Sequence, residues 1–210
     1  MWHLYVIIDK DASGKRELAW VARQAIQGGA DVIQLRDKKA STSDLIKEAK
    51  DLLKITRRAK IPLIINDRVD VAYAVGADGV HLGQDDLPVS VARRILGSRR
   101  IIGKSTHSLA QAKKADREPV DYFALGPVFS TPTKPDYTSV GLRLVGQVSH
   151  IARHPFVAIG GIDESVLTQV ISNGAKCVAV VRAVCAADSP KEACRRLKKV
   201  IFASYKISNK

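Results

Sequence analysis

An α/β fold is predicted from the way two kinds of segment alternate along the 210 residues. Eight short runs rich in Val and Ile have the length of buried strands, and longer stretches with the periodicity of amphipathic helices follow them. Near-continuous apolar strands that alternate with helices are typical of a parallel sheet covered on its outer face. Eight such units favour a closed barrel over an open doubly wound sheet, so the sequence predicts a single-domain (β/α)8 TIM barrel over residues 1–210.

The expected elements follow one another without a linker or a low-complexity segment. The strands are expected at 4–9, 31–37, 62–67, 79–83, 101–106, 122–129, 155–161 and 177–184. The helices are expected at 18–29, 43–59, 70–76, 88–97, 108–115, 144–153, 164–174 and 190–205. Several of these helices end in glycine, which suits the left-handed residue at a helix C-terminus.

Composition excludes several classes of function. The net charge of +13 is spread over the basic stretches 54–60, 97–101 and 194–200, with few aromatic residues between them to stack bases, so we expect no nucleic-acid partner. The three cysteines form no CxxC pair, which argues against a disulfide framework and a structural zinc site. No apolar run is long enough to span a bilayer, so we expect a cytoplasmic protein with no membrane partner. A homo-oligomer is left open.

In such a barrel the active site lies at the C-terminal ends of the strands. In VIQLRDK, strand alternation sends Gln34, Arg36 and Lys38 to one face, which must be the barrel interior or mouth. An amide and two cations there predict an anion cradle, because arginine can bind two phosphate oxygens at once. The alternative is a structural ion pair among inward-facing residues.

Carboxylates end the next two expected strands, as Asn66-Asp67 and Asp85-Asp86. Mg²⁺ prefers one or two carboxylates together with water and substrate phosphates, so this pattern predicts a magnesium site. Each aspartate could instead cap the following helix. We favour the metal for Asp67 and the cap for Asp85.

Ser105 ends another strand and can donate its hydroxyl hydrogen to an anion. His81 and His107 could act as bases, but a lone histidine in such a place is more often a hydrogen-bonded structural residue.

The segment LGPVFSTPTKPD at 125–136 predicts a second anion site. Its prolines restrict the backbone, so the hydroxyl groups of Thr131 and Thr133 and the ammonium group of Lys134 lose little freedom on binding. The glycines of Gly160-Gly161 and the residues after the last strand can supply backbone N–H groups to a phosphate.

The motifs QLRDK, IINDR, GVHLGQDD, GKSTH, LGPVFSTPTK, IGGI and VAVVRA occur in the order found in thiamine-phosphate synthases, and the chain resembles that family over nearly its whole length. The resemblance implies a transferase that joins a pyrimidine diphosphate to a thiazole phosphate with the help of Mg²⁺. It implies that Gln34 contacts the pyrimidine and that Asp67 and Asp86 bind Mg²⁺. The implied diphosphate ligands are Arg36, Lys38, Asn66, Ser105 and Lys134, of which all but Asn66 are expected to be catalytic. The implied thiazole-phosphate ligands are Thr131, Thr133, Gly161, Val181 and Arg182.

Two residues depart from the family pattern. The family often has serine at the position of Arg182, which leaves a backbone contact there, and an aliphatic residue at the position of Lys104, whose side chain is expected to point outward. Two rival functions are a thiazole tautomerase of the same superfamily and a regulator without catalysis. The tautomerase branch commonly has histidine where this chain has Pro127, so Pro127 and Asp86 favour the synthase.

Overall fold

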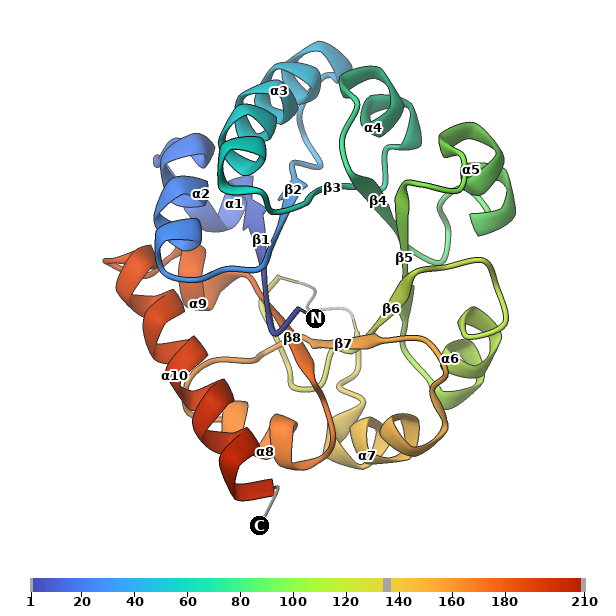
Figure 1. Ribbon diagram of the computed structural model, residues 1–210, viewed down its shortest axis with the longest axis vertical. Coiled ribbons are helices and arrows are strands. Elements are labelled where there is room, and N and C mark those ends of the chain that lie inside the picture. Colours follow the sequence, from blue (N-terminus) through green and yellow to red (C-terminus); the bar gives the residue numbers. More distant parts are fainter. Residues whose placement is uncertain (1, 134–136, 209–210) are drawn as a thin grey trace.

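All eight expected strands form and close into one parallel barrel. The structure is a computed structural model that describes residues 2–133 and 137–208. Strands β1 to β8 pair in chain order, and β8 pairs with β1 (Figure 1). Their bounds are β1 Leu4–Asp9, β2 Val32–Arg36, β3 Leu63–Asn66, β4 Gly79–Leu82, β5 Ile101–Thr106, β6 Tyr122–Leu125, β7 Phe156–Ile159 and β8 Cys177–Val180. The predicted (β/α)8 TIM barrel is confirmed.

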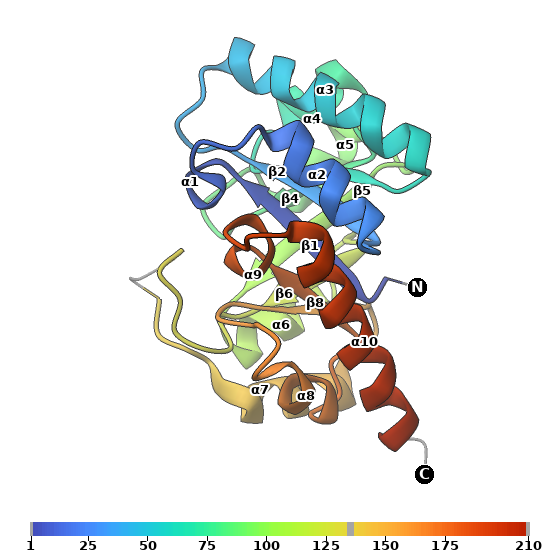
Figure 2. The ribbon, with the colours of Figure 1, turned by 90° about the vertical axis from the view of Figure 1, so that its left-hand side faces the viewer.

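Helices surround the barrel on its outer side (Figures 1 and 2). Serine side chains cap two of them: Ser41 accepts from the Asp44 N–H at 3.2 Å, and Ser108 accepts from the Gln111 N–H at 3.2 Å. Within the described ranges, no helix combines the length and the apolar character needed to cross a bilayer. The helices are α1 Lys10–Ser13, α2 Leu18–Gln27, α3 Thr42–Ala59, α4 Val69–Val75, α5 Val89–Leu96, α6 Leu109–Ala115, α7 Gly141–Ile151, α8 Leu167–Ser172, α9 Arg182–Cys185 and α10 Pro190–Ser208.

Each strand divides its side chains between two packing layers. On β1, Leu4, Val6 and Ile8 belong to the large core between barrel and helices, whereas Tyr5 and Ile7 belong to a smaller cluster inside the barrel. The same alternation puts Ile33 and Leu35 of β2 in the outer core. Gln34 and Arg36 therefore face the interior or the mouth, as the sequence predicts.

Six expected strands end earlier than predicted, and two of them, β6 and β8, end four residues earlier. Strand β6 stops at Leu125 because the nearby Pro127 has no N–H to continue the ladder. Strand β8 stops at Val180, and the next residues form α9, in which the N–H of Cys185 donates to Val181 O at 2.8 Å. An apolar run such as this one does not distinguish strand from short helix by its periodicity.

Candidate active site

A cavity of about 480 Å³ opens among the loops that follow the strands. It lies at the end of the barrel where the sequence predicts the site. Nine of the predicted ligand residues line it: Gln34, Arg36, Asn66, Ser105, Thr131, Thr133, Gly161, Val181 and Arg182. The fold therefore brings together residues from most of the chain in one hollow.

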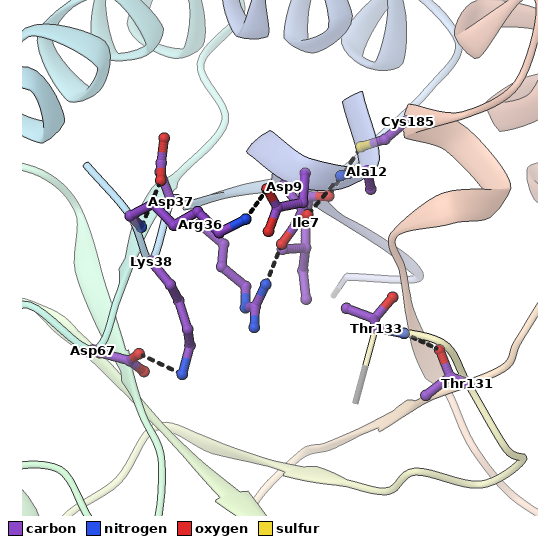
Figure 3. A network of polar contacts seen from close by, with 12 residues as sticks. Ile7, Asp9, Ala12, Arg36, Asp37, Lys38, Asp67, Thr131, Thr133 and Cys185 are labelled. Carbon is purple, nitrogen blue, oxygen red and sulfur yellow. Dashed lines mark hydrogen bonds and ion pairs between the residues drawn. The ribbon is translucent and has the colours of Figure 1, made fainter. Parts of the chain in front are cut away.

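Arg36 forms an ion pair with Asp9, the last residue of β1 (Figure 3). Asp9 is 2% exposed, and its other oxygen accepts from the Ala12 N–H at 2.8 Å, which caps α1. The structural ion pair is thus formed, but a guanidinium has five N–H donors and Arg36 still lines the cavity. Sequence reasoning missed Asp9, although it ends an apolar run just as the other site residues do.

Asp67 and Asp86 lie side by side at the mouth. The Asp86 carboxyl group lies close enough to act on the ionisation of Asp67, and Lys38 Nζ lies 3.4 Å from Asp67 Oδ2 (Figure 3). Burial first, and then the Asp86 carboxyl group, raise the pKa of Asp67 above its usual value. Asp67 is also one of the non-glycine residues with a left-handed backbone, at φ 63°. A residue held in that region is often fixed by a functional role.

Neither predicted capping role is found. The residue before α4 is Arg68 and the residue before α5 is Pro88, and no side-chain cap forms at either position. The capping alternative was therefore wrong for both Asp67 and Asp85.

The loop that carries Asp86 is tied to β5. The Gly83 N–H donates to Asp86 Oδ2 at 2.6 Å, and Lys104 Nζ donates to the Gly83 carbonyl at 2.5 Å. Gln84 Nε2 donates to the carbonyl of Ser105. Lys104 is buried on the helix side of the barrel, where it borders a hollow with Val89 of α5 and Gln111 of α6, so its expected outward direction is confirmed.

Both histidines near the cavity are hydrogen-bonded to neighbouring groups. His81 Nε2 lies 2.9 Å from Ser105 Oγ, and His81 Nδ1 lies 3.0 Å from the Tyr122 hydroxyl. His107 Nδ1 contacts the Gly126 carbonyl, and its backbone N–H donates to Gln111 Oε1 at 2.7 Å. These contacts agree with the structural role that we expected for lone histidines.

The loop after β6 packs against the loop after β7. The N–H groups of Val128 and Phe129 donate to the carbonyls of Ile159 at 2.8 Å and Gly160 at 3.0 Å. Gly161 has φ 62°, and a Cβ there would meet Phe129 Cβ and Ser130 O at 2.7 Å, so only glycine fits without a shift.

Thr131 and Thr133 lie on this loop, and the Thr133 N–H donates to Thr131 Oγ1 at 3.3 Å. Figure 3 shows the two threonines apart from Lys38 and Asp67. The predicted ligand Lys134 lies outside the described residues. The first N–H groups of a helix lack partners within it, and α9 begins at the wall of the same cavity with Arg182. The cavity thus has two polar sides.

Comparison with known proteins agrees with this geometry. The family model described as thiamine monophosphate synthase matches residues 4–184. A thiamine-phosphate synthase of Chloroflexus aurantiacus is 47% identical over 201 residues, which cover 95% of this chain and 93% of the relative. One of Persephonella marina is 48% identical over 198 residues, covering 94% of this chain and 95% of the relative.

A solved structure is similar as well. The thiamine phosphate pyrophosphorylase of Pyrococcus furiosus superposes with a TM-score of 0.89 at 36% identity, covering 97% of this chain and 96% of that one. The sequence match, the barrel and the clustered polar residues lead to the same assignment. The chain belongs to the thiamine monophosphate synthase family.

Proposed function

We propose that this protein is a thiamine-phosphate synthase whose reaction takes place in the cavity of about 480 Å³. The substrates are 4-amino-2-methyl-5-hydroxymethylpyrimidine diphosphate and 4-methyl-5-(2-phosphoethyl)thiazole or its carboxylated form. The products are thiamine phosphate and diphosphate, and the carboxylated thiazole would release CO2 as a third product. The observation that carries this proposal is the convergence of nine ligand residues on one cavity beside the Asp67–Asp86 pair.

The relatives favour this function over its rivals. The proteins of Chloroflexus aurantiacus and Persephonella marina bear the name thiamine-phosphate synthase, and the similarity extends over nearly the full length of both. Neither name is that of a tautomerase or a regulator.

The carboxyl pair fits a magnesium ion. Two adjacent carboxylates repel each other when both are ionised, and burial together with this repulsion raises the pKa of Asp67. A divalent cation would offset the repulsion. The described residues contain no group of three or more His, Cys, Asp and Glu side chains suited to a metal, so water and substrate phosphate would complete the coordination of Mg²⁺.

The diphosphate side of the cavity neutralises the leaving group. Mg²⁺ held by Asp67 and Asp86 would neutralise charge on the departing diphosphate. Arg36 and Lys38 add positive charge, and the Asn66 amide and the Ser105 hydroxyl donate hydrogen bonds to its oxygens. Lys134 belongs to this group on sequence grounds.

The remaining residues align the two rings. Gln34 holds the pyrimidine, while Thr131, Thr133, Gly161 and the backbone at Val181-Arg182 hold the thiazole phosphate. The bond from the pyrimidine methylene carbon to the diphosphate oxygen breaks, and its electron pair leaves with the diphosphate. The amino-pyrimidine ring stabilises the methylene cation until the lone pair of the thiazole nitrogen forms the new C–N bond. The site requires no enzyme nucleophile, and its main contributions are positioning and electrostatic stabilisation.

The test is direct. Purified protein, both phosphorylated substrates and Mg²⁺ are mixed, and thiamine phosphate and diphosphate are measured over time. We expect equal amounts of the two products, and none when either substrate or Mg²⁺ is withheld. Aromatisation of the free thiazole tautomer without coupling would replace this assignment with the tautomerase.

A further inference from the structure

A row of hydrogen bonds crosses the interior of the barrel between two of the proposed ligands, Gln34 and Ser105. Gln34 Nε2 lies 2.7 Å from the Tyr5 hydroxyl, which lies 2.9 Å from the Tyr122 hydroxyl. Tyr122 OH lies 3.0 Å from His81 Nδ1, and His81 Nε2 lies 2.9 Å from Ser105 Oγ. The row joins side chains of β2, β1, β6, β4 and β5.

The middle of the row lies in the core, and its two ends lie at the cavity. Tyr5 is 1% exposed and Tyr122 is 2% exposed, whereas Gln34, His81 and Ser105 are among the residues that line the cavity. Tyr5 and Tyr122 are therefore linked to the cavity by their hydrogen bonds to Gln34 and His81.

The fold leaves space for this row. A Cβ at Gly103 would lie 2.2 Å from Tyr122 Cζ and 2.5 Å from His81 Nδ1, so the absence of a side chain there lets the two rings meet. The rings stack with their centroids 5.5 Å apart and an interplanar angle of 25°. A larger residue at position 103 would separate Tyr122 from His81.

The row has a direction. A hydroxyl group has one hydrogen to donate, so Tyr5, which accepts from the Gln34 amide nitrogen, is left to donate to Tyr122. If Tyr122 then donates to His81 Nδ1, 3.0 Å away, His81 carries its hydrogen on Nε2 and donates to Ser105 Oγ, 2.9 Å away, and the Ser105 hydrogen is available to a ligand in the cavity. Burial raises the pKa of both tyrosines, so both remain protonated donors.

The geometry points to Tyr5 and Tyr122 as positioning residues of the proposed synthase: they set the direction of the row, so that Gln34 presents its amide oxygen to the amino group of the pyrimidine and Ser105 presents its hydrogen to the diphosphate. This inference rests on the proposed function. The reverse direction would turn the Gln34 amide around and present an N–H donor, which cannot pair with an amino hydrogen. The row therefore selects a pyrimidine that has a hydrogen-bond donor at this position.

Selectivity between two ligands tests the inference. We would measure, by calorimetry with Mg²⁺ present, the Kd values of the phosphate esters of the 4-amino pyrimidine and of its 4-oxo counterpart. We expect wild type to bind the amino ester about 100-fold more tightly or better, because a mismatched buried polar group is left unpaired. Tyr122→Phe removes one oxygen and keeps the ring, and it should reduce this ratio about tenfold.

Two further variants make the test specific. Tyr5→Phe breaks the row at the adjacent position and should reduce the ratio in the same way. Tyr205→Phe is the matched control. It removes a hydroxyl of α10 that donates to the carbonyl of Lys176, and neither residue lines the cavity. This variant should leave the ratio unchanged. A general loss of packing would weaken the binding of both esters alike and leave the ratio of their Kd values unchanged.

Nitrogen NMR of the histidine rings provides a measurement that needs no ligand. Wild type should show His81 with its hydrogen on Nε2, and Tyr122→Phe should shift the Nδ1 signal. If wild type makes thiamine phosphate while both row variants fold and keep the full preference for the amino ester, the inference is overturned and the function stands. If wild type makes no thiamine phosphate, both the function and the inference fail.

Discussion

Asp67 and Asp86 come from successive βα units, yet their carboxyl groups interact at the mouth of the barrel, where burial and then Asp86 raise the pKa of Asp67. Lys38 Nζ lies 3.4 Å from Asp67 Oδ2. Two adjacent carboxyl groups are costly to ionise together, and the Mg²⁺ ion of the proposed function would offset that cost.

Removal of either carboxylate should therefore disable the enzyme. Asp67→Asn and Asp86→Asn should each lower kcat/KM about 100-fold or more, since a bound metal contributes several kcal/mol of transition-state stabilisation. Asp85→Asn is the matched control because Asp85 is exposed and lies next to Asp86. Wild-type rates and Mg²⁺ dependence in both variants would remove the metal assignment.

The same pair predicts how the metal-free protein responds to pH. The pKa of Asp67 is raised above its usual value of 3.8, so the folded protein holds this proton more tightly than the unfolded chain does. The stabilisation from Asp67 is thus complete below pH 3.8 and is lost as pH rises through the folded pKa. In EDTA, Asp67→Asn should have a higher Tm than wild type at neutral pH, and Mg²⁺ should reduce that difference. Equal Tm values across the pH range in EDTA would contradict the prediction.

Lys104 is predicted to support the metal site through the loop that carries Asp86. Its Nζ donates to the Gly83 carbonyl, and burial lowers its pKa. Lys104→Met keeps the aliphatic stem and removes the buried charge, so it should leave Tm unchanged or raised while the Mg²⁺ concentration for half-maximal activity rises about tenfold. Lys114→Met serves as the control. Lys114 is a lysine of α6 that borders the same hollow, and within the described part of the chain it forms no hydrogen bond to Gly83. An unchanged Mg²⁺ requirement in Lys104→Met would show that the lysine only fills space.

The loop after β6 should separate the two substrates kinetically. Thr133→Ala should raise the KM for the thiazole phosphate about fivefold to tenfold, because it removes one hydroxyl donor from that phosphate. Lys134→Ala should mainly lower kcat, because positive charge matters most as the diphosphate departs. If both variants changed only the KM of the same substrate, the assignment of Thr133 to the thiazole phosphate and of Lys134 to the diphosphate would be wrong.

The barrel itself was predictable because its strands are buried on both faces and its helices on one, and both patterns are visible in sequence. The direction of Gln34 and Arg36 followed from strand alternation alone. The contacts of Asp9, Tyr5 and Tyr122 did not, because each depends on which strands become neighbours around the closed barrel: Tyr5 and Tyr122 are 117 residues apart and meet at 2.9 Å. That residues 1–210 form one catalytic domain, and that the site residues have the substrate-binding, metal-binding and catalytic roles assigned to them, stay predictions.

The contacts of His107 bear on the closest rival function, that of a thiazole tautomerase. A tautomerase must move a proton and needs an acid–base group at the thiazole, but Pro127 has no titratable atom. His107 is the histidine of the neighbouring strand end, and its Nδ1 is engaged with the Gly126 carbonyl while its ring lies 4.6 Å from the ring of Tyr137. These contacts indicate that His107 supports the loop after β6.

We therefore expect the purified protein to form thiamine phosphate with Mg²⁺ and to show negligible aromatisation of the free thiazole tautomer. We expect His107→Asn to raise the KM for the thiazole phosphate a few-fold, because it alters the loop after β6. We expect no loss of rate of the kind that removal of a catalytic base would cause. A rapid, metal-independent aromatisation that His107→Asn abolishes would instead identify His107 as a proton-transfer group and the protein as a tautomerase.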